Sequence, residues 1–417
     1  MGLVDVVVER VAGLDVSKAD VKACVRVPAE SGARGYRQEV RTFGATTRQL
    51  LRLADWLAHS QVSLVVMEAT GDYWKPVFYL LEQQFEVRLV NARDVKKVPG
   101  RKTDVKDAEW LAQLAQHGLV SASFVPPPPV RRLRDLTRQR ANLVRERVRA
   151  LNQLEKVLED AGIKVSLVLS KTLTQSGRLM IEALVDGERD PYTLADLALG
   201  KARAKIGDLR EALVGRFSDH HGFLARQALR HIDLLDAEIT VFSSRIEQEL
   251  RPSRHHQQLL ITIPGVSDRV AEIILAETGG DMTRFPTAAT LASWAGVAPG
   301  NNESAGKHLS GATTHGNTWL LGALGNAAAA AARTKNTYLG AYYKRLAKRR
   351  GPQRALVAVM HKIILAVWHM LTHDVAYHDL GPDYFRNRPD QIQRRKQRLI
   401  RELAELGVDT TSLAPTA

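Results

Sequence analysis

The chain has 417 residues, 45% of them hydrophobic and 25% charged, a globular composition spread over a length that exceeds one ordinary domain. Its 59 basic and 45 acidic side chains leave a net charge of +14, which favours a polyanionic partner, most often nucleic acid. The single cysteine, Cys24, excludes an internal disulfide framework and a zinc site built from cysteines. We see no leader sequence and no apolar run of about 18 residues, so we expect a soluble, intracellular protein.

Residues 1–125 are predicted to form one domain with a mixed sheet. Apolar and alternating runs predict five strands, at 8–16, 21–27, 37–43, 62–68 and 86–91. Helical periodicity predicts helices at 46–59 and 73–84 and a further helix that opens at Thr103. Three strands followed by alternating helices and strands is the element order of an RNase H-like fold, with helices packed on a mixed sheet.

Residues 126–255 are predicted to be a long helical region, set apart by the proline-rich stretch 124–130. Apolar residues recur at heptad spacing in two series: Val144, Val148, Leu151, Leu154 and Leu158, then Ala225, Ala228, Ile232, Leu235, Ile239, Phe242 and Ile246. This spacing predicts a long antiparallel coiled coil, with an ordinary buried bundle helix as the alternative. The segment between the two arms, 166–222, is polar, and we expect it to be an irregular insertion at the tip.

Residues 256–380 are predicted to form a mostly helical C-terminal domain, followed by a basic helical tail at 381–417. Pro264 and Gly265 lie in a tight turn between two amphipathic stretches, which predicts an element like a helix-hairpin-helix. The free N–H groups of the second helix would hold a DNA phosphate without reading sequence. An ordinary helix connection is the alternative.

Positive charge is concentrated in three segments. Residues 131–151 contain eight arginines and two acids, residues 343–354 contain six cations and no acid, and residues 386–401 contain seven cations and one acid. A solvated helix face would interleave the two signs, so we predict contacts with nucleic-acid phosphates. The predicted nucleic-acid-binding residues are Arg131, Arg132, Arg134, Arg138, Gly265, Lys307, Lys344, Arg345, Lys348, Arg349 and Arg350.

Four carboxylates in the first domain are candidates for a metal site. Asp15 and Glu68 end the first and fourth strands, and Asp104 and Asp107 share one face of the last helix. In an RNase H-like sheet these strand ends are neighbours, so the four groups converge and two Mg²⁺ ions, or Mn²⁺ as a substitute, would offset their repulsion. Each acid taken alone also fits a structural role, as a turn cap, a strand-end acid or an acid at a helix N-terminus.

A polar loop at 301–317, NNESAGKHLSGATTHGN, contains the candidate nucleophile Ser304, with Ser310 as the alternative. Serine in a glycine-rich loop is usually a turn residue, and as a nucleophile it needs a base or metal for activation. This loop holds no evident base. Activation from another domain, in the same or another subunit, is therefore expected.

Several blocks resemble, in order, the DEDD transposases of the insertion sequence 110 group: GLDVSKADVKACV, VVMEATGDYW, NARDVKKVPGRKTDVKDAEWLAQL and ITIPGVSDRVAEIILAETGG. The resemblance implies a RuvC-like nuclease domain, a coiled coil and a C-terminal transposase domain. It also implies a recombinase that cuts and rejoins donor and target DNA, guided by a structured RNA, and that works as a tetramer of two dimers in the bacterial cytoplasm, associated with the nucleoid. Asp15, Glu68, Asp104 and Asp107 match the acidic positions of the family, and Ser304 matches its serine.

Two other functions remain open from the residues. The first is a metal-dependent, structure-specific endonuclease of the junction-resolvase type, in which water is the nucleophile. The second is a nucleic-acid-binding scaffold without catalytic activity.

Overall fold

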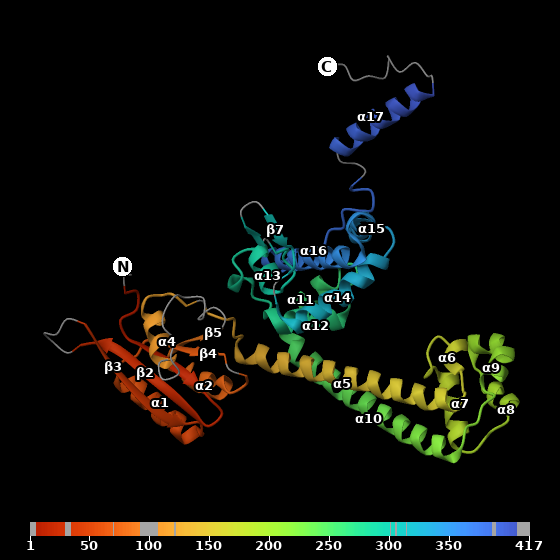
Figure 1. Ribbon diagram of the computed structural model, residues 1–417, viewed down its shortest axis with the longest axis horizontal. Coiled ribbons are helices and arrows are strands. Elements are labelled where there is room, and N and C mark those ends of the chain that lie inside the picture. Colours follow the sequence, from red (N-terminus) through yellow and green to blue (C-terminus); the bar gives the residue numbers. More distant parts are fainter. Residues whose placement is uncertain are drawn as a thin grey trace. The chain divides into compact units, whose positions relative to one another are not determined.

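The computed structural model describes residues 6–29, 35–69, 71–91, 107–120, 122–300, 302–304, 307–313, 315–385 and 389–406. The chain divides into two compact units, Met1–Val125 and Pro126–Ala417 (Figure 1). The first unit contains the mixed sheet and its helices, and the second is almost entirely helical.

The sheet of the first unit has five strands in the order β3-β2-β1-β4-β5. β1, β2 and β3 pair antiparallel, whereas β4 pairs parallel to β1 and β5 parallel to β4. This strand order and these directions are those of an RNase H-like fold, so the predicted fold class of this unit is confirmed. The strands are β1 (Val11–Val16), β2 (Asp20–Pro28), β3 (Tyr36–Gly44), β4 (Leu64–Glu68) and β5 (Glu86–Val90).

Helices cover both faces of this sheet. On one face, α1 (Thr47–His59) and α2 (Trp74–Leu81) pack on the apolar residues of β1 and β4 that include Leu14 and Met67. On the other face, α4 (Asp107–Gln116) packs on the alternate residues of the same strands. The helix that was predicted to open at Thr103 is described only from Asp107 onward.

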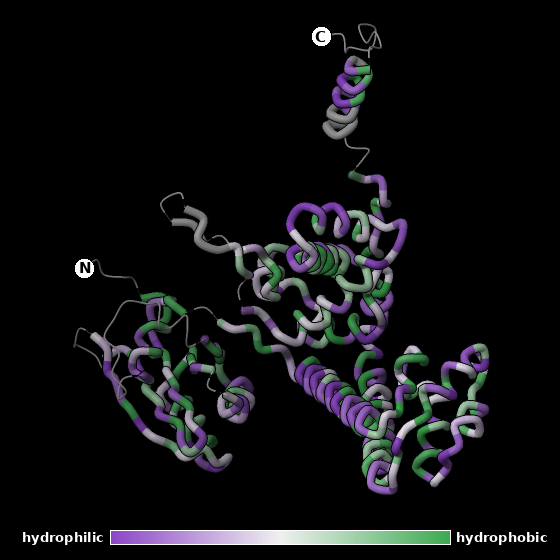
Figure 2. The backbone as a smooth tube through the Cα atoms, turned by 45° about the vertical axis from the view of Figure 1, so that its right-hand side comes forward, coloured by the Kyte–Doolittle hydropathy of each residue, from purple (hydrophilic) through white to green (hydrophobic). Residues whose placement is uncertain are grey.

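The second unit begins with two long helices, α5 (Pro128–Asp160) and α10 (Asp219–Leu250), which run antiparallel. Their polar contacts show the direction, because Arg147 of α5 bonds to Asp236 while Asp160, at the end of α5, bonds to His221 near the start of α10. In Figure 2 the tube of this helix pair is coloured as hydrophilic over much of its length, with hydrophobic residues in between.

The predicted apolar series on α10 is largely confirmed, and that on α5 is corrected. Ala225, Ile232, Leu235, Ile239 and Ile246 are buried. On α5, Leu154 and Leu158 of the predicted series are buried and Val144 and Leu151 pack against the same cluster. Val148 is 49% exposed, whereas Leu143 and Ala150, which were not predicted, are buried. The contact between the helices therefore follows a row shifted by one position from part of the predicted series.

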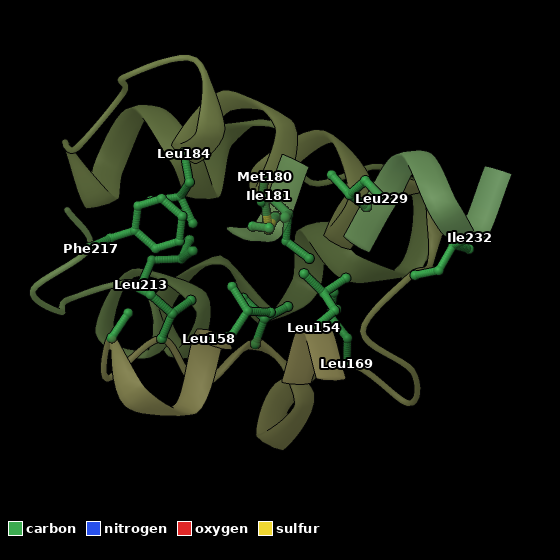
Figure 3. Packing of buried hydrophobic residues seen from close by; sticks show 14 of the residues in the cluster. Leu154, Leu158, Leu169, Met180, Ile181, Leu184, Leu213, Phe217, Leu229 and Ile232 are labelled. Atoms are coloured by element: carbon green, nitrogen blue, oxygen red, sulfur yellow. The ribbon is translucent and has the colours of Figure 1, made fainter. Parts of the chain in front are cut away.

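Residues 165–217 fold into a compact helical cap where α5 ends and α10 begins, so the expectation of an irregular insertion is wrong. Met180, Ile181 and Phe217 pack on Leu154 and Leu158 of α5 in one apolar cluster (Figure 3). Apolar residues spaced on short helices form this core, although the segment as a whole is polar. The helices are α6 (Val165–Val168), α7 (Gln175–Val185), α8 (Pro191–Asp196), η1 (Gly200–Lys205) and α9 (Ile206–Ala212).

The rest of the second unit is a helical body around α16. Its elements are η2 (Arg251–Ser253), α11 (Arg254–Leu260), α12 (Asp268–Thr278), η3 (Met282–Arg284), α13 (Ala288–Trp294), β6 (Asn302–Ser304), β7 (Lys307–Ser310), α14 (Thr318–Arg333), α15 (Tyr338–Arg350), α16 (Pro352–His373) and α17 (Pro389–Glu405). The helices α13, α14 and α15 all contact α16. A mostly helical C-terminal region was predicted, and the short strand pair β6–β7 was not.

One helix within the described ranges, α16, is long and apolar enough to cross a membrane, although no such apolar run was expected from the sequence. Val359, Ile363, Ile364 and Val367 of this helix are fully buried against its neighbours. A core helix meets the same length and hydropathy criteria as a membrane span. The packing of α16 accounts for its apolar composition without a membrane.

Truncation of Leu154 tests the junction between the helical cap and the long helices. We expect Leu154→Ala to lower the free energy of unfolding of the full chain by about 3 kcal/mol, because it removes a fully buried side chain and leaves a cavity. Val148→Ala on the same helix is the matched control, and we expect it to change stability by less than about 1 kcal/mol. Urea unfolding followed by circular dichroism measures both, and equal effects would contradict the assigned packing.

Candidate functional site

Two of the four predicted carboxylates, Asp15 and Glu68, lie at the same level on neighbouring strands. The final pair in the register of the parallel strands β1 and β4 is Leu14 with Met67, so Asp15 and Glu68 follow as the next residue of each strand. Neighbouring strands lie about 4.8 Å apart. Both side chains are partly exposed.

The alternation of side chains along a strand determines the face of the sheet on which these two carboxylates lie. Side chains on a strand alternate between faces, and Val11 of β1 and Val66 of β4 pack against α4. Asp15 and Glu68 are an even number of residues further along the same strands. They therefore lie on the α4 face of the sheet, beyond the edge of its apolar core.

The helix α4 brings Asp107 to this face. It crosses β1 at Gly13, where a Cβ atom would lie 2.2 Å from the carbonyl oxygen of Ala108 and 2.4 Å from the nitrogen of Ala112. Glycine is therefore required for the helix to lie so close to the strand. Asp107 is the first residue of α4 and Asp15 is two residues along β1 from the crossing, so three predicted acids belong to one region of one face.

The fourth predicted acid, Asp104, lies outside the described residues. Within the ranges that the structure describes, no three His, Cys, Asp or Glu side chains come close enough to one another to hold a metal ion. The strand register and the helix crossing thus bring Asp15, Glu68 and Asp107 to one region without assembling them into a closed ligand cage.

The donors in this region suit a hard divalent cation. Carboxylate oxygens are the ligands that Mg²⁺ and Mn²⁺ prefer. The thiol of Cys24 lies on the same face, beneath α4, and burial, with a smaller effect of Glu109, raises its pKa to about 12. Burial disfavours the thiolate, so Cys24 stays protonated near neutral pH and does not add a soft ligand.

In the second unit, Glu277 is the centre of a buried polar network that the sequence did not reveal. Its carboxylate, at the end of α12, is fully buried. Arg138 of α5 binds it with two hydrogen bonds of 2.8 Å each. Arg134 forms an ion pair with the same carboxylate, with Nε 3.2 Å from Oε2, and donates a hydrogen bond of 2.6 Å to the backbone carbonyl of Glu277. A parallel ion pair joins Arg140 to Glu272 one turn earlier on α12.

This network corrects the environment expected for Arg134 and Arg138. The sequence assigned both to nucleic-acid phosphates, whereas the structure shows both on a protein carboxylate. Burial of a carboxylate requires such partners, because an unpaired buried charge is strongly destabilising. Contact of either arginine with phosphate stays a prediction.

Asn317 extends the network to the segment that follows the candidate serine. Its Nδ2 donates to Glu277 at 2.7 Å, and its Oδ1 accepts from the backbone N–H groups of Trp319 and Leu320. Asn317 is thus the N-cap of α14 and is held to α12 at the same time. An Asn before the apolar run TWLLG was the available sequence signal for the cap, but its partner Glu277 is 40 residues away.

The candidate serine lies on a β-hairpin, where the sequence predicted only a loop. In the described backbone, β6 and β7 pair antiparallel, with Ser304 opposite Lys307 and Asn302 opposite Ser310. Ser304 is therefore next to the turn at the hairpin tip. The side chains of Ser304, Lys307 and Ser310 lie outside the described residues.

Two glycines fix the base of this hairpin. A Cβ atom at Gly300 would lie 2.2 Å from the carbonyl oxygen of Ala312, and one at Gly316 would lie 2.3 Å from the backbone of Ala295. Both contacts need a residue without a side chain. The two stems of the hairpin are therefore held against each other and against the end of α13.

Around Gly265, where the sequence predicted an element like a helix-hairpin-helix, the structure has α11, a tight turn and α12. Gly265 has a φ of +91°, and a Cβ atom there would lie 2.4 Å from the carbonyl oxygen of Ala327. The turn therefore packs closely on α14, and this packing by itself requires glycine. Phosphate binding by this turn stays a prediction.

The predicted cationic residues of α15 are available to solvent. Lys344, Arg345, Lys348, Arg349 and Arg350 are all exposed. Arg132 on α5 is 59% exposed and lies 3.7 Å from Glu249, whereas Arg131 is partly buried. Exposed cations on one helix suit the electrostatic binding of a polyanion.

Comparison with known proteins identifies the family of the chain. A family model for DEDD transposases of the IS110 group matches residues 12–163, and a model described as "Transposase IS116/IS110/IS902 family" matches residues 257–344. Together they span more than half of the chain. The chain is thus a transposase, an enzyme that acts on DNA. It belongs to the IS116/IS110/IS902 transposase family.

Two curated relatives resemble the chain over most of its length. One is the insertion element IS900 uncharacterized 42 kDa protein of Mycobacterium paratuberculosis, 26% identical over an alignment of 395 residues that covers 88% of this chain and 96% of the relative. The other is the transposase for insertion sequence element IS1111A of Coxiella burnetii, 26% identical over 333 residues, 77% of this chain and 81% of the relative.

A solved structure of Thermus thermophilus RuvC matches 27% of this chain and 99% of its own, with 14% identity and a TM-score of 0.21. At that score the match carries no argument. The assignment of the first unit to the RNase H-like fold rests on its strand order and directions.

Substitution of Gly13 tests the placement of α4 over the acidic residues. We expect Gly13→Ala to destabilise the first unit by about 1–3 kcal/mol, because the added Cβ meets the backbone of α4. Gly44→Ala is the control, since a Cβ atom there would lie no closer than 3.4 Å to another group. Hydrogen exchange of the α4 amides would rise only in Gly13→Ala, and unchanged protection would contradict the crossing.

Neutralisation of Glu277 tests the buried network. Glu277→Gln leaves two guanidinium groups beside a neutral amide, and we expect a loss of roughly 3 kcal/mol in the free energy of unfolding. Glu238→Gln, an exposed acid on α10, is the control and should change stability by less than about 0.5 kcal/mol. Thermal and urea unfolding of the two variants measure the difference. Equal stability of the two variants would contradict a stabilising role for the buried charge of Glu277.

Proposed function

We propose that this transposase is a recombinase that cuts and rejoins DNA through a serine nucleophile, with its acidic site holding divalent cations. The observation that supports the proposal most is the position of Asp15 and Glu68 at one level of neighbouring strands, on the face that α4 and Asp107 share. Carboxylates gathered in this way suit phosphoryl transfer.

Divalent cations, two Mg²⁺ or alternatively Mn²⁺, would be held by Asp15, Glu68, Asp107 and Asp104. When bound, such ions polarise a scissile phosphate and stabilise the attacking and leaving oxygens. The carboxylates themselves supply the negative charge that attracts the cations, and they position the phosphate through those cations. The family implies a DNA substrate, and the specific ion is part of this proposal.

Ser304 is the proposed nucleophile, with Ser310 as the alternative. Its Oγ would attack phosphorus and form a serine–phosphate bond while the bond from phosphorus to a deoxyribose oxygen breaks. The serine proton passes to a base, and the departing sugar oxygen takes up a proton to become a hydroxyl. The reverse attack by a hydroxyl of another strand rejoins DNA and restores serine, so the cycle needs no ATP.

Nucleic-acid contacts are proposed for the exposed cations of α15, for Arg131 and Arg132, for Lys307 and for the Gly265 turn. A structured guide RNA from the same element is proposed as a further partner, as the family resemblance implies. The net charge of +14 supports binding of two polyanions.

Self-association into dimers and a tetramer is proposed, with the α5–α10 pair acting as a coiled coil. On α10, Leu234 is 59% exposed and Val241 is 68% exposed. They are seven residues apart and so form a second apolar row outside the seam with α5. A second copy of the helix pair would cover this row, and the serine of one copy would then work with the carboxylates of another.

Trapping the covalent intermediate tests the proposal. The full chain is incubated in Mg²⁺ with RNA and duplex DNA that carry the sequences flanking the reading frame. We expect a protein–DNA adduct that resists denaturation and falls at least roughly 10³-fold in Ser304→Ala. Ser293→Ala, an exposed serine on α13, is the control, and Ser310→Ala decides between the two candidates.

The acidic site is tested in the same assay. Asp15→Asn should abolish strand cleavage, whereas Asp55→Asn, an exposed acid on α1, should leave it unchanged. Cleavage without any adduct would identify a water-using nuclease in place of a serine recombinase. Full cleavage by Asp15→Asn would show that the acidic site takes no part in cleavage, and only a role in binding would then remain for it.

A further inference from the structure

A cavity of about 940 Å³ lies at the base of the serine hairpin, between the hairpin stems and the helices α15 and α16. We call it the hairpin-base cavity. One wall is formed by the stems, through Pro299 before β6 and Ala312 and Thr313 after β7. The close contact of Gly300 with Ala312 joins these two stems, so this wall is a fixed part of the body.

The opposite wall offers an aromatic face and polar groups. Tyr342 of α15 and His361 of α16 line the cavity, and both are half-buried. The Tyr342 ring is held from outside by Phe385, with ring centroids 5.8 Å apart. Burial, with a smaller effect of Lys362, lowers the pKa of His361, so its neutral ring both donates and accepts hydrogen bonds near pH 7.

The floor and the mouth of the cavity differ in polarity. Val357 and Ala358 of α16 and Val297 form an apolar floor. Arg354 and Gln353, both exposed in the first turn of α16, stand at the mouth. An apolar slot with an aromatic wall, a few hydrogen-bonding groups and a cation at its entrance is the environment that a nucleobase with its phosphate needs.

The hairpin-base cavity differs in the charge of its lining from another cavity in the second unit. The other, of about 630 Å³, is lined by Arg251, Arg254 and Arg269 but also by three carboxylates, Glu247, Asp268 and Glu272. Among the described residues that line the hairpin-base cavity, none is acidic. It is therefore the cavity that suits a nucleotide.

We propose that the hairpin-base cavity holds one nucleotide of the DNA strand, unstacked from its neighbours, close to the phosphate that Ser304 attacks. The proposal rests on the serine chemistry proposed above. Ser304, the last residue of β6, follows Gly300 by four residues, so the chain places the two at most about 14 Å apart. That limit equals about four base steps of duplex DNA, so one strand can contact both the cavity and the serine.

The role of this site is to keep the cut strand open. Strand exchange requires the bases beside the cut to leave their old partners, and an unstacked base held by protein cannot pair again. Unstacking costs a few kcal/mol in duplex DNA, which the contacts in the cavity would offset. The site would bind any base, because an aromatic wall and an apolar floor read the π-face and not the sequence.

The test uses 2-aminopurine, whose fluorescence rises when the base leaves the stack. The full chain binds duplexes that carry the sequences flanking the reading frame, with 2-aminopurine at one position at a time around the cut. We expect a rise of roughly threefold or more at one position within about four nucleotides of the cut. A second set carries 2-aminopurine in the RNA.

Variants connect the signal to the cavity. Ala358→Trp and Thr313→Trp each fill the cavity, from the floor and from the exposed rim, and both should abolish the rise. Ser293→Trp, on the exposed face of α13, is the matched control and should retain it. Arg354→Gln should weaken the signal relative to Arg333→Gln, an exposed arginine at the end of α14. Circular dichroism checks that each variant folds.

No rise at any DNA position, a rise that survives both filling variants, or a rise confined to the RNA would overturn the proposal. The serine adduct is measured in the same samples as an independent readout. An adduct without unstacking would contradict the proposed role of the cavity and would still support the serine chemistry. Unstacking without an adduct would support nucleotide binding in the cavity and would contradict the serine chemistry.

Discussion

The buried carboxylate of Glu277 determines how the second unit is organised. Two guanidinium groups from α5 and one amide from Asn317 bind it, so one charge connects the long helix pair, α12 and the start of α14. A carboxylate with no exposure is stable only if its partners are in place, which makes the geometry of all three elements interdependent. The stem that leaves the serine hairpin ends at Asn317. The position of the candidate nucleophile Ser304 thus depends on Glu277, which lies 27 residues before it in the sequence.

In the first unit, the corresponding constraint is steric. α4 lies on β1 only because Gly13 has no side chain, and this contact brings Asp107 to the face that bears Asp15 and Glu68. The same device recurs at Gly300 and Gly316, which fix the stems of the hairpin. Each half of the proposed chemistry is therefore positioned by close backbone contacts, and the side chains of Asp15 and Glu68 stay partly exposed, where DNA can reach them.

The hairpin-base cavity and the basic helix α15 belong to the same part of the molecule as the hairpin. Tyr342 lines the cavity, while Lys344, Arg345 and Lys348 follow it on the exposed surface of the same helix. One helix would therefore hold both the phosphates of a strand and a base that leaves the stack. This arrangement gives the helical body a direct part in strand separation, beyond the support of the serine.

The sequence by itself determined the strands and helices of the first unit, the buried series on α10 and the helical nature of the second unit, because local periodicity records which side chains face a core. It also selected the acidic residues, since strand ends are visible in the pattern. It placed part of the row on α5 one position off, expected an irregular segment at 165–217 where a compact cap lies, and did not reveal that Arg134 and Arg138 bind Glu277. These features depend on tertiary contacts, because a helix face, a charge and a glycine acquire their roles from residues distant in the chain. The network around Glu277 and the hairpin-base cavity both form only where such residues meet.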